Sequence, residues 1–292
     1  IFYFFEHSAS SHTLVLADDI TAYKKCAEAK VRCFSGHLSE SHVQHWQGGL
    51  GMVSGAFKQK GYDFKQPKLF PNGAQSQASL PSQGQYEVYQ YMGESEFNQR
   101  PQPYANTQLE ALQKDMHMSS GQGDCRSFNV GKTFTFSDHE DTRFNNESFL
   151  ITAMNTQAVQ PNQSGANQSS GIATYSNHFE CVPKDTPYRP SAIQIKPVIS
   201  GVQTAIVTGD PGDEQHIDKY GRVKIQFHWD REGKYDSKSS CWIRVAQNWA
   251  GNKWGAFFFP RVGQEVLVEF INGDPDQPII SGAVYNADLM PP

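Results

Sequence analysis

The sequence has no apolar run near the roughly 20 residues that a membrane-spanning helix needs. It also lacks a basic excess, since 25 Lys and Arg stand against 30 Asp and Glu, for a net charge of −5. Nucleic-acid binders usually carry a basic stripe that neutralises phosphates, so this balance argues against that class. The 292 residues are enough for about two domains, and a hydrophobic content of 38% is enough to build their cores.

Cysteine is scarce and scattered. A disulfide framework needs paired cysteines, whereas this chain has five: Cys26, Cys33, Cys125, Cys181 and Cys241. We therefore expect reduced thiols in a protein made in a cytoplasm. The opening residues IFYFF follow no basic region and run straight into Glu6 and His7, so we interpret them as a strand entered midway and not as a signal peptide. A missing signal excludes ordinary export, but not export through a dedicated machine.

Signatures of catalysis are missing as well. There is no Gly-x-Ser-x-Gly elbow, and the glycines at 49, 51 and 55 are one place off a dinucleotide loop. The acid pairs at 18–19 and 94/96 resemble glycosidase pairs only in spacing, and solvated charge is the commoner role. Cys33, His37, His42 and His45 have spacings that zinc tolerates, but without CxxC or HExxH we favour polar loop histidines. We expect no enzyme activity, no metal and no cofactor.

The first two thirds of the chain predict a mainly β region with one helix. We expect strands at 2–6, 13–16, 86–92, 133–136 and 149–154, a short alternating piece at 62–64, and exposed loops at 71–85 and 160–170. Thr107 and Glu110 fit a capping box at the start of a helix whose apolar face is Leu109, Leu112 and Met116. Gly121 and Gly123 would end that helix. Four prolines between 182 and 197 indicate an extended connector, so we place the domain boundary between residues 190 and 191.

The last hundred residues predict a small β-barrel. Residues 222–229 alternate strictly, with Val223, Ile225, Phe227 and Trp229 on one face. Further strands are expected at 203–208, 241–247, 264–271 and 279–285, separated by turn residues. Five short strands suit a closed barrel, with the OB fold as the leading candidate. Aromatics crowd this region, and we favour packing inside the barrel or between subunits over an exposed surface that stacks bases.

Four motifs here resemble, in order, the VgrG family of type VI secretion spike proteins. They are DKYGRVKIQFHWDR at 218–231, SCWIRVAQ at 240–247 with WG at 254–255, PRVGQEVLV at 260–268 and GDPDQPIISG at 273–282. The resemblance assigns a role in assembly to Asp218, Tyr220, Gly221, Arg222, Phe227, Trp229, Asp230, Trp242, Arg244, Trp254, Pro260, Arg261, Gly263, Glu265, Gly273, Asp274 and Pro275. Residues 2–16, 62–67 and 134–139 are similar to the family more loosely.

The resemblance implies a phage-tail-hub-like region over residues 1–190 and an OB-fold barrel over 191–292. It further implies a homotrimer on the Hcp tube, with a needle that carries a PAAR-repeat tip protein and effectors through a target membrane. Compared with the family, the chain lacks the first part of the hub and stops where the needle begins. We expect Arg222, Arg244 and Arg261 to pair with Asp218, Asp230 or Glu265. The alternative is an OB-fold module that binds single-stranded nucleic acid or an oligosaccharide; a phage-tail lysozyme would need a hydrolase domain that is not seen here.

Overall fold

The computed structural model describes residues 1–292 apart from 37, 69–71, 77–85, 92–100, 161–172 and 191–194. The chain divides into two compact units. One, the N-terminal unit, contains residues 1–60, 71–90 and 99–192, and the other, the barrel unit, contains residues 61–70, 91–98 and 193–292. No helix in the described ranges is long and apolar enough to cross a membrane.

The described residues are mainly β, as the sequence predicts, with one α-helix. The helix is α1 (Pro101–Gln113). The strands before the barrel are β1 (Phe2–His7), β2 (His12–Ala17), β3 (Lys24–Arg32), β4 (Val43–Gly48), β5 (Ala56–Lys60), β6 (Asn72–Ser76), β7 (Glu87–Tyr91), β8 (Ser119–Gly123), β9 (Lys132–Asp138), β10 (Ser148–Val159) and β11 (Thr174–Pro183).

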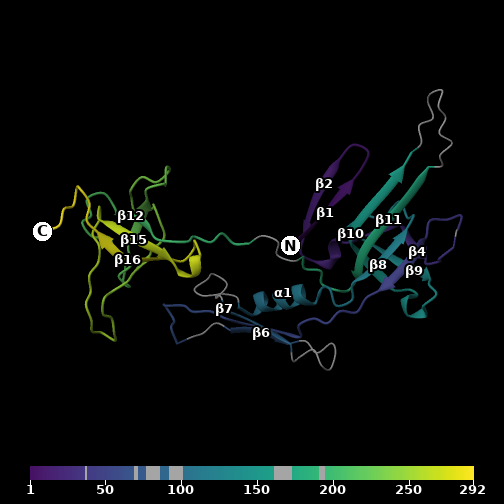
Figure 1. Ribbon diagram of the computed structural model, residues 1–292, viewed down its shortest axis with the longest axis horizontal. Helices are drawn as coiled ribbons and strands as arrows, with labels where there is room; N and C mark the ends of the chain where they lie inside the picture. The colour runs from purple at the N-terminus through teal and green to yellow at the C-terminus, as the bar shows by residue number, and fades with distance from the viewer. Residues whose placement is uncertain (37, 69–71, 77–85, 92–100, 161–172, 191–194) are drawn as a thin grey trace. The chain divides into compact units, whose positions relative to one another are not determined.

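The main sheet of the N-terminal unit has six strands in the order β3-β9-β10-β11-β8-β4, with β10 and β11 as its longest pair (Figure 1). Its first and last strands meet, because Cys33 after β3 bridges Val43 at the start of β4 in parallel fashion. The N–H of Phe34 also donates to the carbonyl of Val43 at 2.9 Å. The two outer strands are therefore joined at this point, and the sheet closes there, which leaves less free edge than an open sheet would present.

The interior of this closed sheet is aromatic. Alternation along β9 turns Phe134 and Phe136 inward, and both are fully buried. They stack edge-on at 5.2 Å, and Phe179 from β11 packs against Phe134 at 5.6 Å. Edge-to-face contacts of this kind add roughly 0.5–1.5 kcal/mol each to the area that they bury.

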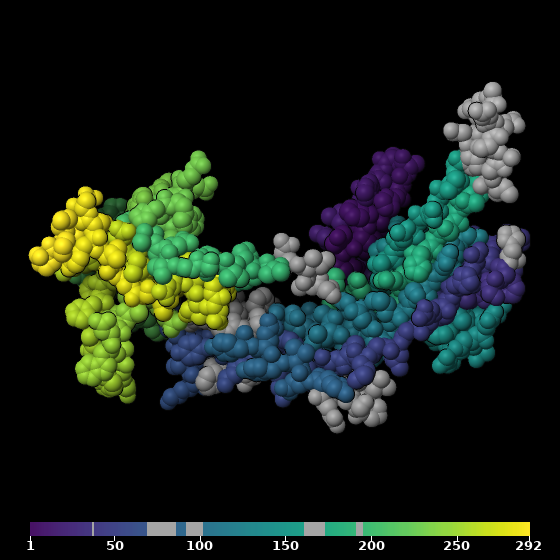
Figure 2. Space-filling view, viewed as in Figure 1, coloured from purple at the N-terminus to yellow at the C-terminus, as the bar shows by residue number. Residues whose placement is uncertain are grey.

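Strands β1 and β2 form a separate antiparallel ribbon, with Tyr3 opposite Leu16 and Phe5 opposite Leu14. Phe2 and Phe4 on its inner face are buried, whereas the outer face leaves Tyr3 and Leu16 exposed. The ribbon projects from the rest of the N-terminal unit (purple in Figure 2).

Three expectations about the middle of the chain are wrong. Helix α1 begins at Pro101, so Thr107 lies inside it and its hydroxyl donates to the carbonyl of Pro103 at 3.1 Å instead of capping. Gly121 and Gly123 do not end the helix but belong to β8, where β11 and β4 pack too closely for larger side chains. Residues 62–64 form no strand, since Asp63 accepts the N–H of Lys65 in a turn.

The loop expected at 71–85 contains a strand, β6, which pairs with β5. Residues 77–85, and nearly all of the loop expected at 160–170, lie outside the described residues. Strand β5 and helix α1 share a small core in which Phe57 and Leu109 are buried.

The barrel unit has the five strands that the sequence predicts: β12 (Gln203–Thr208), β13 (Lys224–Phe227), β14 (Arg244–Val245), β15 (Glu265–Phe270) and β16 (Pro278–Val284). They follow the order β13-β12-β15-β16-β14. Val223 and Ile243 exchange both backbone hydrogen bonds, at 3.0 and 2.8 Å, and so join the two outer strands. This join closes the five strands into a barrel.

Candidate functional site

The first family motif folds into a tight turn around Asp218. One oxygen of its carboxylate, Oδ1, accepts the backbone N–H groups of Tyr220 and Arg222, both at 2.9 Å. Gly221 completes the turn with a φ of +72°, and the ring of Phe257 lies where a Cβ would stand, 2.7 Å away. Only glycine meets both conditions, a left-handed backbone and an occupied side-chain position.

Arg222 and Asp218 form an ion pair within this turn. The guanidinium Nε and Nη2 of Arg222 reach Oδ2 of Asp218 at 2.8 and 2.6 Å, and both side chains are about 15% exposed. Burial alone would raise the pKa of Asp218, but the hydrogen bonds from Arg222 and from the N–H of Tyr220 outweigh burial and hold this pKa below its usual value. The carboxylate therefore stays charged.

A phenylalanine from far upstream completes the cluster. Phe64 belongs to the barrel unit, and its ring meets that of Tyr220 edge-on at 5.3 Å. The guanidinium of Arg222 lies 5.4 Å from the Phe64 ring centre, and that of Arg244 lies 4.9 Å from it. Half-buried cation–π contacts of this kind contribute roughly 1 kcal/mol each. Sequence reasoning missed Phe64, although its segment resembles the family.

The expected ion pair Arg222–Asp218 is present. Arg261 lies 3.8 Å from Glu214, and the guanidinium of Arg244 lies over the ring of Phe64. Asp230 accepts the N–H groups of Glu232 and Gly233 at 2.9 and 3.0 Å, so it shapes a turn. Glu265 accepts the side-chain amide of Asn286 at 3.0 Å.

The remaining motif residues hold turns at the ends of strands. Pro260 is buried, and the N–H of Gly263 donates to the carbonyl of Val207 at 2.9 Å. Gly273 accepts the N–H of Ile199, and Asp274, followed by the half-buried Pro275, binds Lys196 at 2.6 Å. Burial acts to raise the pKa of Asp274, but the hydrogen bond from Lys196 outweighs it and lowers this pKa.

Of the two expected positions for the aromatics, inside the barrel or between subunits, the first is wrong. The core is aliphatic, and consists of Ala205, Val207, Val223, Ile225, Ile243, Val266, Val268 and Ile280. Trp229 lies beyond the end of β13 and is 66% exposed, because the strand stops at Phe227. Trp254 is exposed as well. Trp242 is half-buried, with His216 stacked on it at 5.0 Å and the ammonium group of Lys224 over its ring at 5.1 Å.

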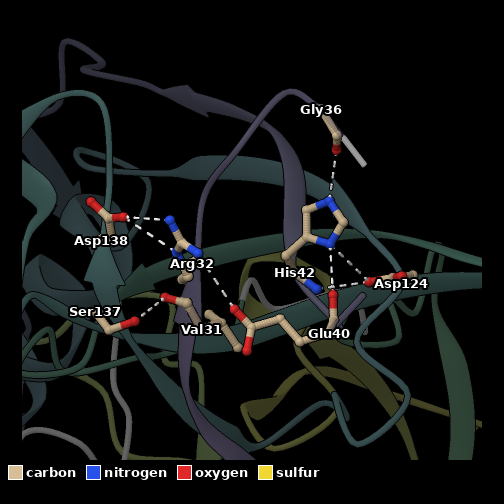
Figure 3. Close-up of polar contacts among 8 residues, drawn as sticks. All are labelled: Val31, Arg32, Gly36, Glu40, His42, Asp124, Ser137 and Asp138. Atoms are coloured by element: carbon tan, nitrogen blue, oxygen red, sulfur yellow. Dashed lines mark hydrogen bonds and ion pairs between the residues drawn. The ribbon is translucent and has the colours of Figure 1, made fainter. Parts of the chain in front are cut away.

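In the N-terminal unit, a polar network surrounds His42 where the six-stranded sheet closes (Figure 3). Its Nδ1 lies 2.9 Å from the carbonyl oxygen of Glu40 and its Nε2 lies 2.9 Å from that of Gly36. Whichever nitrogen carries the proton, it has an acceptor. The backbone N–H of His42 donates to Asp124 at 2.8 Å. His42 is thus fully buried and not a solvated loop histidine, and its ring nitrogens already face carbonyl oxygens in place of a metal.

The neighbouring strands carry a second set of contacts in this network. Arg32 binds Asp138 at 3.0 Å and lies 3.7 Å from Glu40 (Figure 3). The hydroxyl of Ser137 donates to the carbonyl of Val31 at 3.1 Å. These contacts tie β3 to β9 beside the point of closure.

Within the described ranges, one group of side chains has donor atoms close enough together for a metal ion: Asp210, Asp213 and His216. The sequence did not point to it. The two aspartates are exposed, Asp213 and His216 already lie 3.1 Å apart, and Asp210 accepts the hydroxyl of Ser237. We assign no ion to it.

Comparison with known proteins identifies the class. Residues 1–162 match the family described as phage tail baseplate hub (GPD), and residues 203–285 match the type VI secretion system/phage-baseplate injector OB domain. A hub region followed in sequence by an injector OB domain is the domain order of a contractile-injector baseplate protein. The chain belongs to the phage tail baseplate hub family. Its similar proteins include VgrG spike proteins of type VI secretion.

The similar proteins agree on this assignment. The chain is 36% identical over 298 residues to the type VI secretion system spike protein VgrG4b of Pseudomonas aeruginosa, covering 98% of this chain and 37% of that protein. It is 34% identical to VgrG3 of Vibrio cholerae, covering 98% of this chain and 28% of that protein. The chain thus spans less than half the length of these relatives.

Among solved structures, the Escherichia coli c3393 protein shares the fold, with a TM-score of 0.55 at 17% identity over 97% of this chain and 56% of that protein. It is described as a component of the type VI secretion system with structural similarity to the phage T4 tail proteins gp27 and gp5.

Proposed function

We propose that this chain forms the hub and the barrel of a type VI secretion spike, and that its role is structural and not catalytic. The observation that carries the proposal is the order of the two matches, because a hub region followed by an injector OB domain occupies most of one chain. We assign the hub to residues 1–190 and the barrel to residues 191–292. The named relatives are spike proteins, which agrees with a scaffold.

The closure of both sheets agrees with a protein that bears mechanical force. A sheet closed on itself presents no continuous row of free backbone groups along which it would pair wrongly or peel apart. The contact between Cys33 and Val43 closes one sheet, and the contact between Val223 and Ile243 closes the other. The cluster of Asp218, Arg222 and Phe64 then fixes the motif turn against the barrel wall.

The assembly that we propose is a homotrimer seated on the Hcp tube. Longer family members add a needle that carries a PAAR-repeat tip protein and effectors, and the whole spike crosses a target membrane transiently. The protein is made in the bacterial cytoplasm and leaves through the machine itself. The motif residues around Asp218, together with the exposed tryptophans, serve assembly, and no nucleic acid or cofactor takes part.

Export of the tube protein tests this proposal. In a strain in which this gene is the one remaining spike gene, its deletion is expected to abolish Hcp in the culture medium, and the intact gene to restore it. A gene with Arg222→Ala is expected to restore less export at an equal cellular level of the protein, as checked by immunoblot. Undiminished Hcp export from the deletion strain would overturn the proposal.

A further inference from the structure

The barrel unit carries two separate groups of aromatic side chains that reach its surface. The first, which we call the aromatic arm, is the segment of residues 247–260 between β14 and β15, with Trp249, Trp254, Phe257 and Phe258 all more than half exposed. The second, which we call the aromatic column, consists of Phe227, Trp229 and Phe270, of which Trp229 is 66% exposed while the other two pack against the barrel core. In Figure 2, the yellow-green part of the barrel unit that contains the arm projects from the body of that unit.

The arm is held in one conformation. The N–H of Ala256 donates to the carbonyl of Trp249, and that of Gly251 to the carbonyl of Trp254, each at 2.9 Å. The side chain of Gln247 holds the other end, because it donates to the carbonyl of Phe258 at 2.7 Å and accepts its N–H at 2.8 Å. An ordered aromatic surface loses little conformational entropy on binding, so the arm is preorganised for a partner.

The column is equally well ordered. The ring of Trp229 lies nearly parallel to that of Phe227, with centres 5.0 Å apart, and Phe270 continues the stack at 6.1 Å. The indole N–H of Trp229 donates to Gln203 at 3.0 Å, which fixes the ring plane. A flat face of the tryptophan is therefore presented to the outside.

The two groups lie toward opposite ends of strand β13. Phe257 of the arm packs against Gly221, before β13, whereas Trp229 follows the end of β13. Strand β13 itself, Lys224–Phe227, spans roughly 13 Å between them. One barrel thus carries two different groups of exposed aromatic rings, toward opposite ends of β13. A closed ring of identical subunits needs such a pair, since each copy contacts the next through unlike surfaces.

Charge and area agree with this arrangement. Residues 247–260 contain one charged side chain, Lys253, and no acid. The column is flanked by the exposed acids Glu232 and Glu269, with Arg231 as the cation beside them. The four exposed rings of the arm offer on the order of 500 Å² for burial, more than half of the roughly 800 Å² that each partner buries in a standard interface.

We infer that the aromatic arm of one copy docks on the aromatic column of the next copy, and that three such contacts close the ring of the spike at the level of the barrel. The inference rests on the proposed trimer and specifies the surfaces that form it. Tryptophan and phenylalanine anchors in an otherwise polar rim are typical of the residues that dominate binding energy in interfaces.

Cross-linking between copies tests the pairing of unlike surfaces. The exposed Cys241 is changed to Ser in the full chain, and Asn252→Cys on the arm or Arg231→Cys beside the column is then added. A short bismaleimide is expected to link a mixture of the two variants to each other and neither variant to itself. Exclusive links of arm to arm or of column to column, or no links between the two variants, would overturn the inference.

Mass measurement of interface variants gives a second readout. Trp254→Ser and Trp229→Ser are each expected to raise the dissociation constant of the assembly at least roughly 30-fold. Met52→Ser, which changes an even more exposed apolar side chain in the N-terminal unit, is expected to leave it unchanged. A trimer that survives both tryptophan changes contradicts the inference and leaves the proposed function standing. Conversely, a chain that forms the cross-linked ring but does not support Hcp export would contradict the proposed function and leave the inference standing.

Discussion

The Arg222 guanidinium reaches one oxygen of the Asp218 carboxylate through two nitrogens, at 2.8 and 2.6 Å, while the other oxygen accepts two backbone N–H groups. Every strong acceptor position of this carboxylate is thereby occupied from within its own turn. The most recognisable motif of the barrel therefore builds a rigid corner, which orients Arg222 toward the ring of Phe64.

Replacing Asp218 by Asn is expected to lower the free energy of unfolding by about 1–3 kcal/mol, because a half-buried guanidinium then loses its counter-charge. Urea denaturation of the full chain measures this change. Asp288→Asn, at an exposed position, is the matched control and is expected to stay within about 0.5 kcal/mol of the unchanged chain.

The pH dependence of stability checks the same pair. Since the pKa of Asp218 is lower in the folded chain than the unfolded value of about 3.9, its contribution is present above that pH and is lost as the pH falls through the folded pKa. The unmodified chain is thus expected to lose stability more steeply below about pH 4 than Asp218→Asn. If the free energy of unfolding falls equally steeply below about pH 4 in both chains, the ion pair does not stabilise the fold.

Gly221→Ala is expected to destabilise the barrel by more than the roughly 1–2 kcal/mol that a left-handed backbone alone costs an alanine. The added cost comes from the ring of Phe257 at the Cβ position. Gly201→Ala has a similar φ, +88°, with open space around it, and so isolates the backbone effect. Equal losses in thermal unfolding experiments would mean that Phe257 moves aside freely.

His42→Ala is expected to destabilise the N-terminal unit by about 2–4 kcal/mol, since it leaves a cavity and removes the ring nitrogens from the carbonyls of Gly36 and Glu40. The exposed His45→Ala serves as control and should change little. Hydrogen exchange of β3 and β4 gives a local readout, and unchanged protection there in His42→Ala would contradict the role of His42 in closing the sheet.

Thiol labelling is expected to distinguish Cys241 from the other four cysteines. Burial raises the pKa of Cys26 and that of Cys33 to about 11, and it raises the pKa values of Cys125 and Cys181 further, so little reactive thiolate forms there at neutral pH. Cys241 is exposed. Mass spectrometry after brief iodoacetamide treatment should find one label in the folded chain and five in urea. Early labelling of Cys125 would contradict the buried core.

Strand periodicity predicted the barrel well, because half-buried strands leave a period of two in the sequence. Val223 and Ile225 were placed on one face, and both are buried. The same alternation misplaced Trp229, since periodicity does not show where the backbone leaves the sheet. The start of α1 was missed for a related reason: residues 101–106 carry little apolar pattern, and Thr107 offered a plausible cap further on.

Local sequence patterns could not predict contacts between segments that are far apart in the chain. Phe64 and Tyr220 are 156 positions apart, and the resemblance marked both regions without pairing them. His42 was interpreted as solvated because its neighbours are polar. Its burial follows from the closure of the sheet between Cys33 and Val43, which has no local signature. The site was therefore predicted as a set of residues, whereas its geometry required the structure.

The mass of the chain in solution tests the central claim most directly. Light scattering at about 100 μM is expected to give three times the 32.7 kDa of one chain, and added single-stranded oligonucleotide should leave this mass unchanged. A monomer that binds the oligonucleotide, with affinity that falls steeply as salt rises, would contradict the spike and favour a free OB-fold binding module.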